Sequence, residues 1–279
     1  MAVWLPPPGT RVPMDGAVDA AVDGTVVVHH QAVQPGEGSH GNVHSWDVSI
    51  GVDGPGTRFV LFTAGCPLRC LYCENPDTWT AAGGRRTTVE EVMTRVRKYQ
   101  RTLKASGGGV TVSGGEPLAQ PRFTGDVLSA CHDSGLHTAL DTSGYLGHLA
   151  TDAMLADIDL VLLDIKSFQR DLYRRVTGRG LEPTLRFADR LAELGKPVWI
   201  RFVLVPGLTD GPENVAGLAD YVAGLPNVER VDVLAYHRLG EPKYARLGIK
   251  YPLTGVPEPD EAQVEAVRRA FSDRGLVVT

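Results

Sequence analysis

GCPLRCLYCEN, residues 65–75, contains three of the four cysteines in this chain of 279 residues. Cys66, Cys70 and Cys73 follow a C-x3-C-x2-C spacing, which brings three thiolates together in one loop. Structural zinc sites are closed by four protein ligands, whereas an iron–sulfur cluster held by three cysteines leaves one iron free to bind another molecule. The fourth cysteine, Cys131, lies in a helical pattern and is typical of a buried apolar residue. The three clustered cysteines therefore predict an open metal site.

The composition indicates which partners and compartments to expect. The net charge is −5, with Lys and Arg interspersed among Asp and Glu, so the sequence shows no basic face for a phosphate backbone. No apolar stretch approaches the roughly 18 residues that a membrane-spanning helix requires. The first residues resemble no secretory leader, and cysteines are too few for a secreted disulfide scaffold. We expect a soluble, cytoplasmic protein that binds neither nucleic acid nor membrane.

The chain divides into two parts by composition. Residues 1–43 are punctuated by PPPG, PGEG and SHGN, which indicates a Pro- and Gly-rich N-terminal extension. Residues 44–279 are predicted to form one core domain, because a chain of this length is at the upper end for a single domain and α/β barrels reach such sizes undivided.

From Asp53 onward, short apolar runs rich in β-branched residues alternate with longer segments of helical period. The predicted strands are 57–63, 108–113, 137–141, 160–165, 198–205 and 230–236. The predicted helices are 89–103, 121–135, 183–195, 213–225 and 259–275. Several strands are apolar on both faces, which favours a parallel sheet covered by helices. Such βα units form either an open doubly wound sheet or a barrel, and the pattern alone does not separate the two.

Chemically capable residues follow the ends of the predicted strands. In chain order they are Cys66 to Cys73, Gly114-Gly115-Glu116, Asp141, Asp164 with Lys166, and His237. Each one alone could be a helix cap or a surface residue. Because parallel strands present their carboxyl ends on one side of a sheet, we expect these residues to converge on one site. Arg201 lies inside an apolar strand and therefore needs a functional or ionic partner.

Together these segments resemble the radical S-adenosylmethionine enzymes, and specifically the pyruvate formate-lyase activating enzyme family. The matching segments are GCPLRCLYCEN, VSGGEP, LDTSG, LVLLDIK, VWIRFVLVPG and LAYH, with HSWDVSIGVDGPGTRF before the cysteines and ENPDTW after them. The resemblance covers about residues 44–275 and implies a partial (β/α)6 TIM-like barrel. The chain lacks the cysteines of an inserted ferredoxin-like domain, which favours the short type of activating enzyme.

The resemblance implies a cofactor pair and a reaction. Cys66, Cys70 and Cys73 would bind a 4Fe-4S cluster whose fourth iron holds S-adenosylmethionine. Reductive cleavage of that molecule gives a 5′-deoxyadenosyl radical, which abstracts hydrogen from a glycine of a partner such as pyruvate formate-lyase. The implied partners are therefore a glycyl radical enzyme and a flavodoxin or ferredoxin-like electron donor.

The resemblance also implies roles for individual residues. Cofactor contacts are implied for Tyr72, Cys73, Glu74, Gly115, Asp164, Ile165, Lys166 and His237, with Glu116 supporting the loop of Gly115. Asp141 and Asp164 match positions near a monovalent cation, which is a secondary hypothesis. Asp53, in the VDGPG segment, matches a loop that holds the partner's peptide, and Arg201 is a second candidate for that contact.

Two alternatives remain open at this point. Glu74-Asn75 stands where the family commonly has His-Asn, so an anion replaces a residue that could be cationic beside the expected substrate entrance. This departure is compatible with a radical S-adenosylmethionine enzyme that acts on a small molecule or another peptide. The second alternative is a non-catalytic module whose three cysteines and His44 bind zinc, although such a site would not explain the polar residues at the strand ends.

Overall fold

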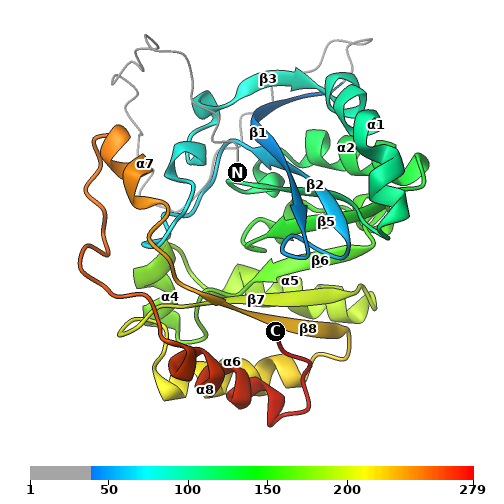
Figure 1. Cartoon of the computed structure of the whole chain (residues 1–279). Helices are drawn as coiled ribbons and strands as arrows, with labels where there is room; N and C mark the ends of the chain where they lie inside the picture. The colour runs from blue at the N-terminus through cyan, green and yellow to red at the C-terminus, as the bar shows by residue number, and fades with distance from the viewer. Residues whose placement is uncertain (1–38) are drawn as a thin grey trace. The chain divides into compact units, whose positions relative to one another are not determined.

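The computed structural model describes residues 39–279, which form an α/β fold around one eight-stranded sheet. Its six parallel strands match the predicted ones: β2 (Thr57–Thr63), β4 (Gly109–Gly114), β5 (His137–Thr142), β6 (Leu160–Asp164), β7 (Val198–Leu204) and β8 (Val228–Ala235). They lie side by side in chain order (Figure 1). In a doubly wound sheet the strand order changes direction part-way across the sheet. Here it runs in one direction only, so the barrel-type alternative is confirmed. The sheet ends at β8 without closing onto the first strand, as expected for a partial barrel.

Two strands that the sequence analysis did not predict extend the sheet. β1 (His40–Ile50) pairs antiparallel with β2, and β3 (Arg85–Thr88) pairs antiparallel with β1. β1 begins inside the segment predicted as an extension; apart from residues 39–43, that segment lies outside the described residues. Trp46 on β1 stacks on Phe59 of β2 with ring centroids 5.5 Å apart, and this contact packs β1 against the core residue Phe59.

Helices connect the parallel strands. The five predicted helices are present as α1 (Val89–Ala105), α2 (Pro121–Asp133), α5 (Glu182–Glu193), α6 (Pro212–Ala223) and α8 (Glu261–Ser272). The shorter α3 (Asp152–Ala156), α4 (Arg170–Thr177) and α7 (Glu241–Arg246) were not predicted, because so few turns give no clear period. Single 3-10 turns occur at η1 (Pro76–Thr78), η2 (Ala81–Gly83), η3 (Pro117–Ala119) and η4 (Gly147–Leu149). Over residues 39–279, no helix combines the length and apolar character needed to cross a membrane.

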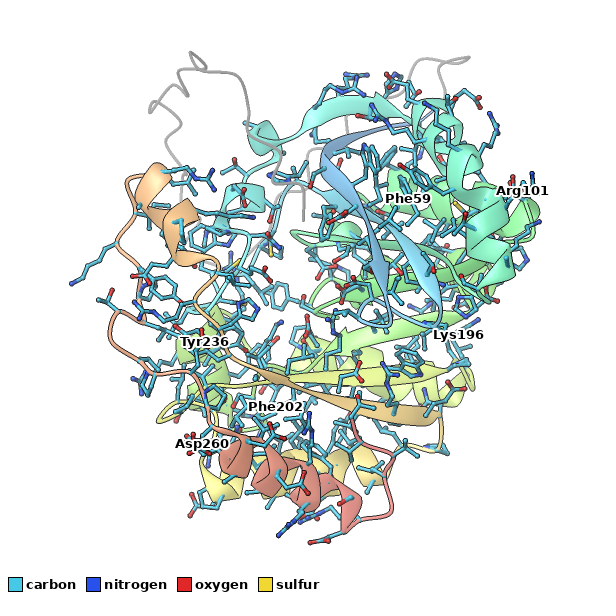
Figure 2. The ribbon with its side chains drawn as sticks, viewed as in Figure 1. Phe59, Arg101, Lys196, Phe202, Tyr236 and Asp260 are labelled. Atoms are coloured by element: carbon cyan, nitrogen blue, oxygen red, sulfur yellow. The ribbon has the colours of Figure 1, made fainter. Side chains whose placement is uncertain are left out.

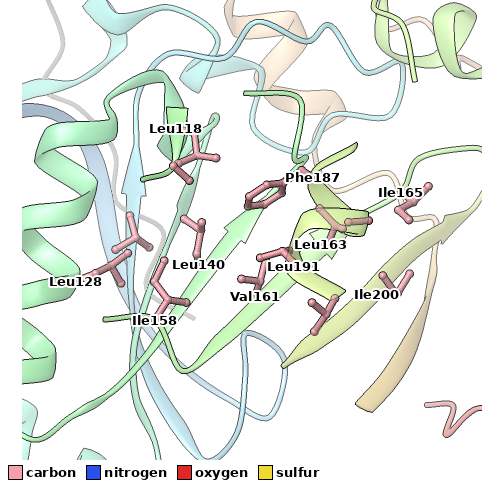
Figure 3. Close-up of a cluster of buried hydrophobic side chains, with 14 of the residues drawn as sticks. Leu118, Leu128, Leu140, Ile158, Val161, Leu163, Ile165, Phe187, Leu191 and Ile200 are labelled. Atoms are coloured by element: carbon pink, nitrogen blue, oxygen red, sulfur yellow. The ribbon is translucent and has the colours of Figure 1, made fainter. Parts of the chain in front are cut away.

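The main core lies between the sheet and its helices. Figure 3 shows Leu140 and Leu163 of neighbouring strands facing Phe187 and Leu191 of α5, and all four side chains are buried. Alternate residues of the same strands point to the other face of the sheet. There the side chains are apolar near the strand starts and become polar near the carboxyl ends, where Asp141 is one example. The fold thus places its polar inner residues on the side of the cysteine loop.

Gly109 is a position where β4 and β5 approach closely. It pairs with His137, and a Cβ atom at residue 109 would lie 1.8 Å from the His137 carbonyl oxygen. We predict that Gly109→Ala lowers the free energy of unfolding by about 2–3 kcal/mol, because the backbone must shift to admit the methyl group. Urea denaturation measures this change.

Gly125→Ala in α2 is the matched control. Its new Cβ would meet Met154 Cγ at 3.6 Å, an ordinary contact, so we expect a gain of about 0.5–1 kcal/mol from helix propensity. Equal changes in the free energy of unfolding for the two substitutions would contradict the close approach of β4 and β5 at Gly109.

Candidate active site

The cysteine loop, residues 65–75, lies between β2 and η1 at the carboxyl end of the sheet. It has no regular secondary structure, so its shape depends on backbone hydrogen bonds to other segments. Gly65 N donates to Thr78 O at 2.7 Å, and Leu71 N donates to Val176 O of α4 at 2.9 Å. The first bond closes the loop on its own exit, and the second fixes its middle to a helix about a hundred residues further along the chain.

The three thiols of this loop are partly buried. Burial raises the pKa of Cys70 to about 12; the Lys166 ammonium acts in the opposite direction, and a neighbouring Cys73 thiolate adds to the rise. Burial and the nearby Cys70 likewise raise the pKa of Cys66. Three thiolates can coexist here only with a cationic partner, and soft sulfur ligands select iron–sulfur chemistry. The donor set therefore fits a cluster bound by three cysteines.

The Gly114-Gly115-Glu116 loop lies directly against the start of the cysteine loop. Gly115 N donates to Thr63 O at 2.8 Å, and Glu116 N donates to Gly65 O at 2.9 Å. A Cβ atom on Gly115 would lie only 2.5 Å from Gly65 O, so this contact requires glycine. Gly115 is consequently held beside Cys66.

Glu116 links the ends of two neighbouring strands. Its Oε1 accepts from Leu118 N (3.1 Å) and Thr142 Oγ1 (2.6 Å), and its Oε2 accepts from Ser143 N (3.0 Å) and Ser143 Oγ (2.5 Å). The side chain is fully buried, and burial raises its pKa although all four hydrogen bonds favour the ionised form. Glu116 supports its own loop, as the resemblance implied, and also fixes that loop to the end of β5.

Asp164 and Lys166 form an ion pair next to the cysteines. Lys166 Nζ lies 2.7 Å from Asp164 Oδ2, and the two side chains are only 14% and 19% exposed, so the pair is not a surface ion pair. Burial lowers the pKa of Lys166, but the Asp164 carboxylate together with Tyr72 and Cys70 outweighs this effect, and the net pKa rises. The ammonium also lies 5.9 Å from the ring centroid of Tyr72, which is itself buried. Ile165, which lies between Asp164 and Lys166 in the sequence, is fully buried and donates its N–H to Arg201 O.

Asp141 and Arg201 meet inside the barrel, on β5 and β7. Arg201 Nη1 lies 3.1 Å from Asp141 Oδ2, and the same oxygen accepts from Ser113 Oγ at 2.6 Å. Burial raises the pKa of Asp141, and the guanidinium of Arg201 opposes that rise. Asp141 Oδ1 and Arg201 Nε are buried and have no hydrogen-bond partner among residues 39–279. Arg201 therefore has the ionic partner that its position required, while each member keeps one polar atom free for a ligand.

Asp53 lies in the turn between β1 and β2. Its carbonyl oxygen accepts from Thr111 Oγ1 at 2.6 Å, and Arg58 Nε donates to the same hydroxyl at 2.9 Å. The turn is therefore fixed to β4 through Thr111, and the Asp53 carboxylate contributes to the electrostatic surroundings of Arg201.

A segment that we call the strap, residues 237–246, runs alongside the exit of the cysteine loop. His237 Nε2 lies 3.7 Å from Glu74 Oε2, with both side chains about half exposed. Lys243 Nζ donates to Asn75 Oδ1 at 2.6 Å. The Tyr244 ring meets Trp79 edge-on at 5.7 Å. These successive contacts keep His237 beside Glu74, the residue after the third cysteine; Figure 2 shows Tyr236, the residue before His237, at the end of β8.

His44, the proposed fourth zinc ligand, is engaged elsewhere. Its Nε2 lies 3.2 Å from Asp77 Oδ2, and its Nδ1 is 2.9 Å from Ser45 Oγ. In the described part of the chain, no three His, Cys, Asp or Glu side chains are close enough together to hold a single metal ion. The geometry gives no support to the zinc module.

The structure thus brings most of the predicted residues together. Around the cysteines lie Tyr72, Glu74, Gly115, Asp164, Ile165, Lys166 and His237, while Asp141, Arg201 and Asp53 lie deeper in the barrel or at its hairpin. The sequence analysis did not identify Ser113, Thr142, Ser143 and Lys243 as site residues. Thr142 and Ser143 directly follow Asp141, so their place at a strand end was an available signal. Ser113 ends the predicted strand 108–113 and so gave the same signal, whereas Lys243 gave none, because its partner Asn75 is distant in sequence.

Comparison with known proteins agrees with this arrangement. Residues 60–219 match the model of the Radical SAM superfamily. The chain is 45% identical over 233 residues to the pyruvate formate-lyase-activating enzyme of Clostridium pasteurianum, covering 84% of this chain and 98% of the relative. The chain belongs to the pyruvate formate-lyase-activating enzyme family of radical SAM proteins. This family implies a 4Fe-4S cluster and S-adenosylmethionine as the cofactors of the site.

Other family members and solved structures extend the comparison. The pyruvate formate-lyase 1-activating enzyme of Escherichia coli (strain K12) is 40% identical over 237 residues, covering 84% of this chain and 96% of that enzyme. A domain of the pyruvate-formate lyase-activating enzyme from Bacteroides vulgatus superposes with a TM-score of 0.53 at 29% identity, covering 62% of this chain and 98% of that domain. Streptococcus suis SuiB bound to its precursor peptide superposes with a TM-score of 0.61 over 81% of this chain and 48% of SuiB, but at 16% identity this shows the fold alone.

Glu116→Gln tests the link between β4 and β5. The amide NH2 of glutamine would face an N–H or O–H donor on either side, and the Ser143 and Leu118 amides cannot reverse their direction. We expect the free energy of unfolding to fall by about 2 kcal/mol, measured by urea denaturation. Glu193→Gln, on the exposed end of α5, is the control and should stay within about 0.5 kcal/mol of the parent. A Glu116→Gln protein as stable as this control would contradict the hydrogen bonding described.

Proposed function

We propose that this chain activates a glycyl radical enzyme of the pyruvate formate-lyase type, by generating a radical from S-adenosylmethionine and abstracting hydrogen from one glycine of the partner. The observation that supports this most strongly is the contact between the cysteine loop and the Glu116-anchored Gly115 loop, with the Asp164–Lys166 pair beside them. That combination provides a cluster site with an adjoining place for a ligand, in a chain 40–45% identical to activating enzymes over nearly their full length.

Each part of the site has a distinct task in this proposal. Cys66, Cys70 and Cys73 hold the cluster, which supplies the electron that cleaves the sulfonium when both cofactors are bound. The remaining residues bind and orient S-adenosylmethionine; they are Gly115, Tyr72, Glu74, Asp164, Ile165, Lys166 and His237. Lys166 offers an ammonium for the ligand's carboxylate, and His237 is held by the strap beside Glu74.

The inner residues are proposed to receive the partner's peptide. Arg201 has a buried Nε without a partner among the described residues, and the Asp53 turn is fixed nearby through Thr111. Asp141 Oδ1, likewise unpartnered in that part of the chain, is the oxygen that would bind a monovalent cation together with Asp164. The cation is a secondary part of the proposal, because Arg201 and Lys166 already pair with these two carboxylates.

Two further expectations belong to this proposal. The reaction needs one external electron for each S-adenosylmethionine cleaved, so we expect a flavodoxin or ferredoxin-like donor in the same compartment. A cytoplasmic location follows from that requirement and from the expected partner. The Glu74 departure keeps one alternative, in which the same radical chemistry acts on a small molecule or another peptide.

Anaerobic reconstitution with iron and sulfide tests the proposal. The reduced protein, mixed with S-adenosylmethionine and a pyruvate formate-lyase, should give a glycyl radical signal by electron paramagnetic resonance. Cys70→Ala should lose both the bound iron and this signal, whereas Cys131→Ala should retain about four irons per chain, because Cys131 is buried between helices. S-adenosylmethionine cleavage without a glycyl radical would overturn the activating role and favour the small-molecule alternative.

A further inference from the structure

Five arginines gather beside the cysteine loop, on a chain whose net charge is −5. We call them the arginine patch: Arg69 in the loop itself, Arg170, Arg174 and Arg175 on α4, and Arg179 directly after it. Residues 170–182, which contain four of these arginines, include only two carboxylates, Asp171 and Glu182. Four of these arginines lie within residues 170–179, and Arg69, about a hundred residues earlier in the chain, joins them only on folding.

Backbone contacts place the patch directly against the loop. Arg69 N donates to Thr177 O at 2.8 Å, next to the bond between Leu71 N and Val176 O. Arg179 Nε donates to Pro67 O at 2.9 Å. Figure 1 shows α4 close to the segment that contains the cysteines. The last turn of α4 and Arg179 are therefore hydrogen-bonded directly to the cysteine loop.

The charges of the patch are available to a partner. α4 buries Tyr173 and Val176, which leaves the side chains of Arg174 and Arg175 exposed. In the part of the chain that the structure describes, neither of these two forms an ion pair, while Arg170 pairs with Glu182 at 2.7 Å. The Arg69 guanidinium lies over the loop, where it donates to Cys66 O at 2.7 Å. The patch retains an excess of positive charge on the outer side of the cluster site.

The other approaches to the cysteines are less suited to an external redox protein. The inner side faces the barrel, where the ligand and the partner's peptide are proposed to bind. The strap lies along the loop exit, where Arg238 pairs with Glu241 at 2.6 Å, and Lys243 pairs with Asp77 at 3.4 Å and donates to the Asn75 amide oxygen. The arginine patch presents two adjacent exposed arginines, Arg174 and Arg175, that pair with no acid among the described residues.

We propose that the arginine patch is the docking surface for a small acidic one-electron carrier of the flavodoxin type. This inference rests on the proposed function, which consumes one external electron per reaction. The flavin hydroquinone anion becomes the neutral semiquinone by giving up one electron, and the cluster passes from its 2+ to its 1+ level; no proton or atom moves between the proteins. A positive patch beside the cluster attracts the carrier's acidic rim and brings the two redox centres close.

The test compares two arginine variants in the reconstituted full-length protein. Arg174→Glu/Arg175→Glu reverses the exposed charges, and Arg174→Gln/Arg175→Gln removes them with less strain on the last turn of α4. Arg101→Glu is the matched control, because Arg101 is exposed on α1, well away from α4 (Figure 2). The probe is a purified flavodoxin. Calorimetry under anaerobic conditions gives the Kd for oxidised flavodoxin at low and high ionic strength, and visible absorbance gives the rate of cluster reduction.

We expect the Glu double variant to raise the Kd about tenfold at low ionic strength, with a smaller rise for the Gln variant and no change for Arg101→Glu. The rate of cluster reduction by flavodoxin hydroquinone should fall by a similar factor. Cluster reduction by dithionite, and the S-adenosylmethionine cleavage that dithionite drives, should be unchanged. Unchanged flavodoxin binding in both double variants, with normal circular dichroism, would overturn the docking surface. If the parent protein did not cleave S-adenosylmethionine with dithionite as the reductant, the proposed function would be refuted instead, so the two failures are distinguishable.

Discussion

The backbone hydrogen bonds that hold the cysteine loop are the constraint on which the rest of the site depends. A loop without regular structure keeps three thiols together only if other segments hold it, and here Thr78 and Val176 accept from its two halves. The Gly115 loop then lies against Gly65, and Glu116 fixes that loop to β5. The position of each ligand-binding element therefore follows from the position of the cysteines.

Charge pairing completes the site within the barrel. Asp164 with Lys166 and Asp141 with Arg201 bring buried charges from β5, β6 and β7 to the carboxyl side of the sheet. Burial penalises each of these charges, and each is compensated by its partner: Asp164 by Lys166 two residues later, and Asp141 on β5 by Arg201 on β7, across the intervening β6. Outside the barrel, Arg238 and Lys243 of the strap pair with acids, whereas Arg174 and Arg175 of the arginine patch form no ion pair with the described residues.

The sequence predicted those features that are encoded locally. The six parallel strands were visible as apolar runs, and the cysteines as a motif of eight residues. β1 and β3 were missed because their polar residues hide the alternation, and α4 was missed because it is too short to show a period. The pairing of Ser113 with Asp141, and of Lys243 with Asn75, depends on strand register and on contacts between distant segments. No local pattern contains that information.

The central claim is that three cysteines hold a cluster with one iron open to S-adenosylmethionine. Electron paramagnetic resonance of the reduced, reconstituted protein tests this most directly, with spectra recorded before and after S-adenosylmethionine is added. The account predicts the signal of a reduced 4Fe-4S cluster whose shape and g-values change when S-adenosylmethionine binds. A protein that contains zinc in place of iron, or a cluster signal that S-adenosylmethionine leaves unaltered, would contradict it.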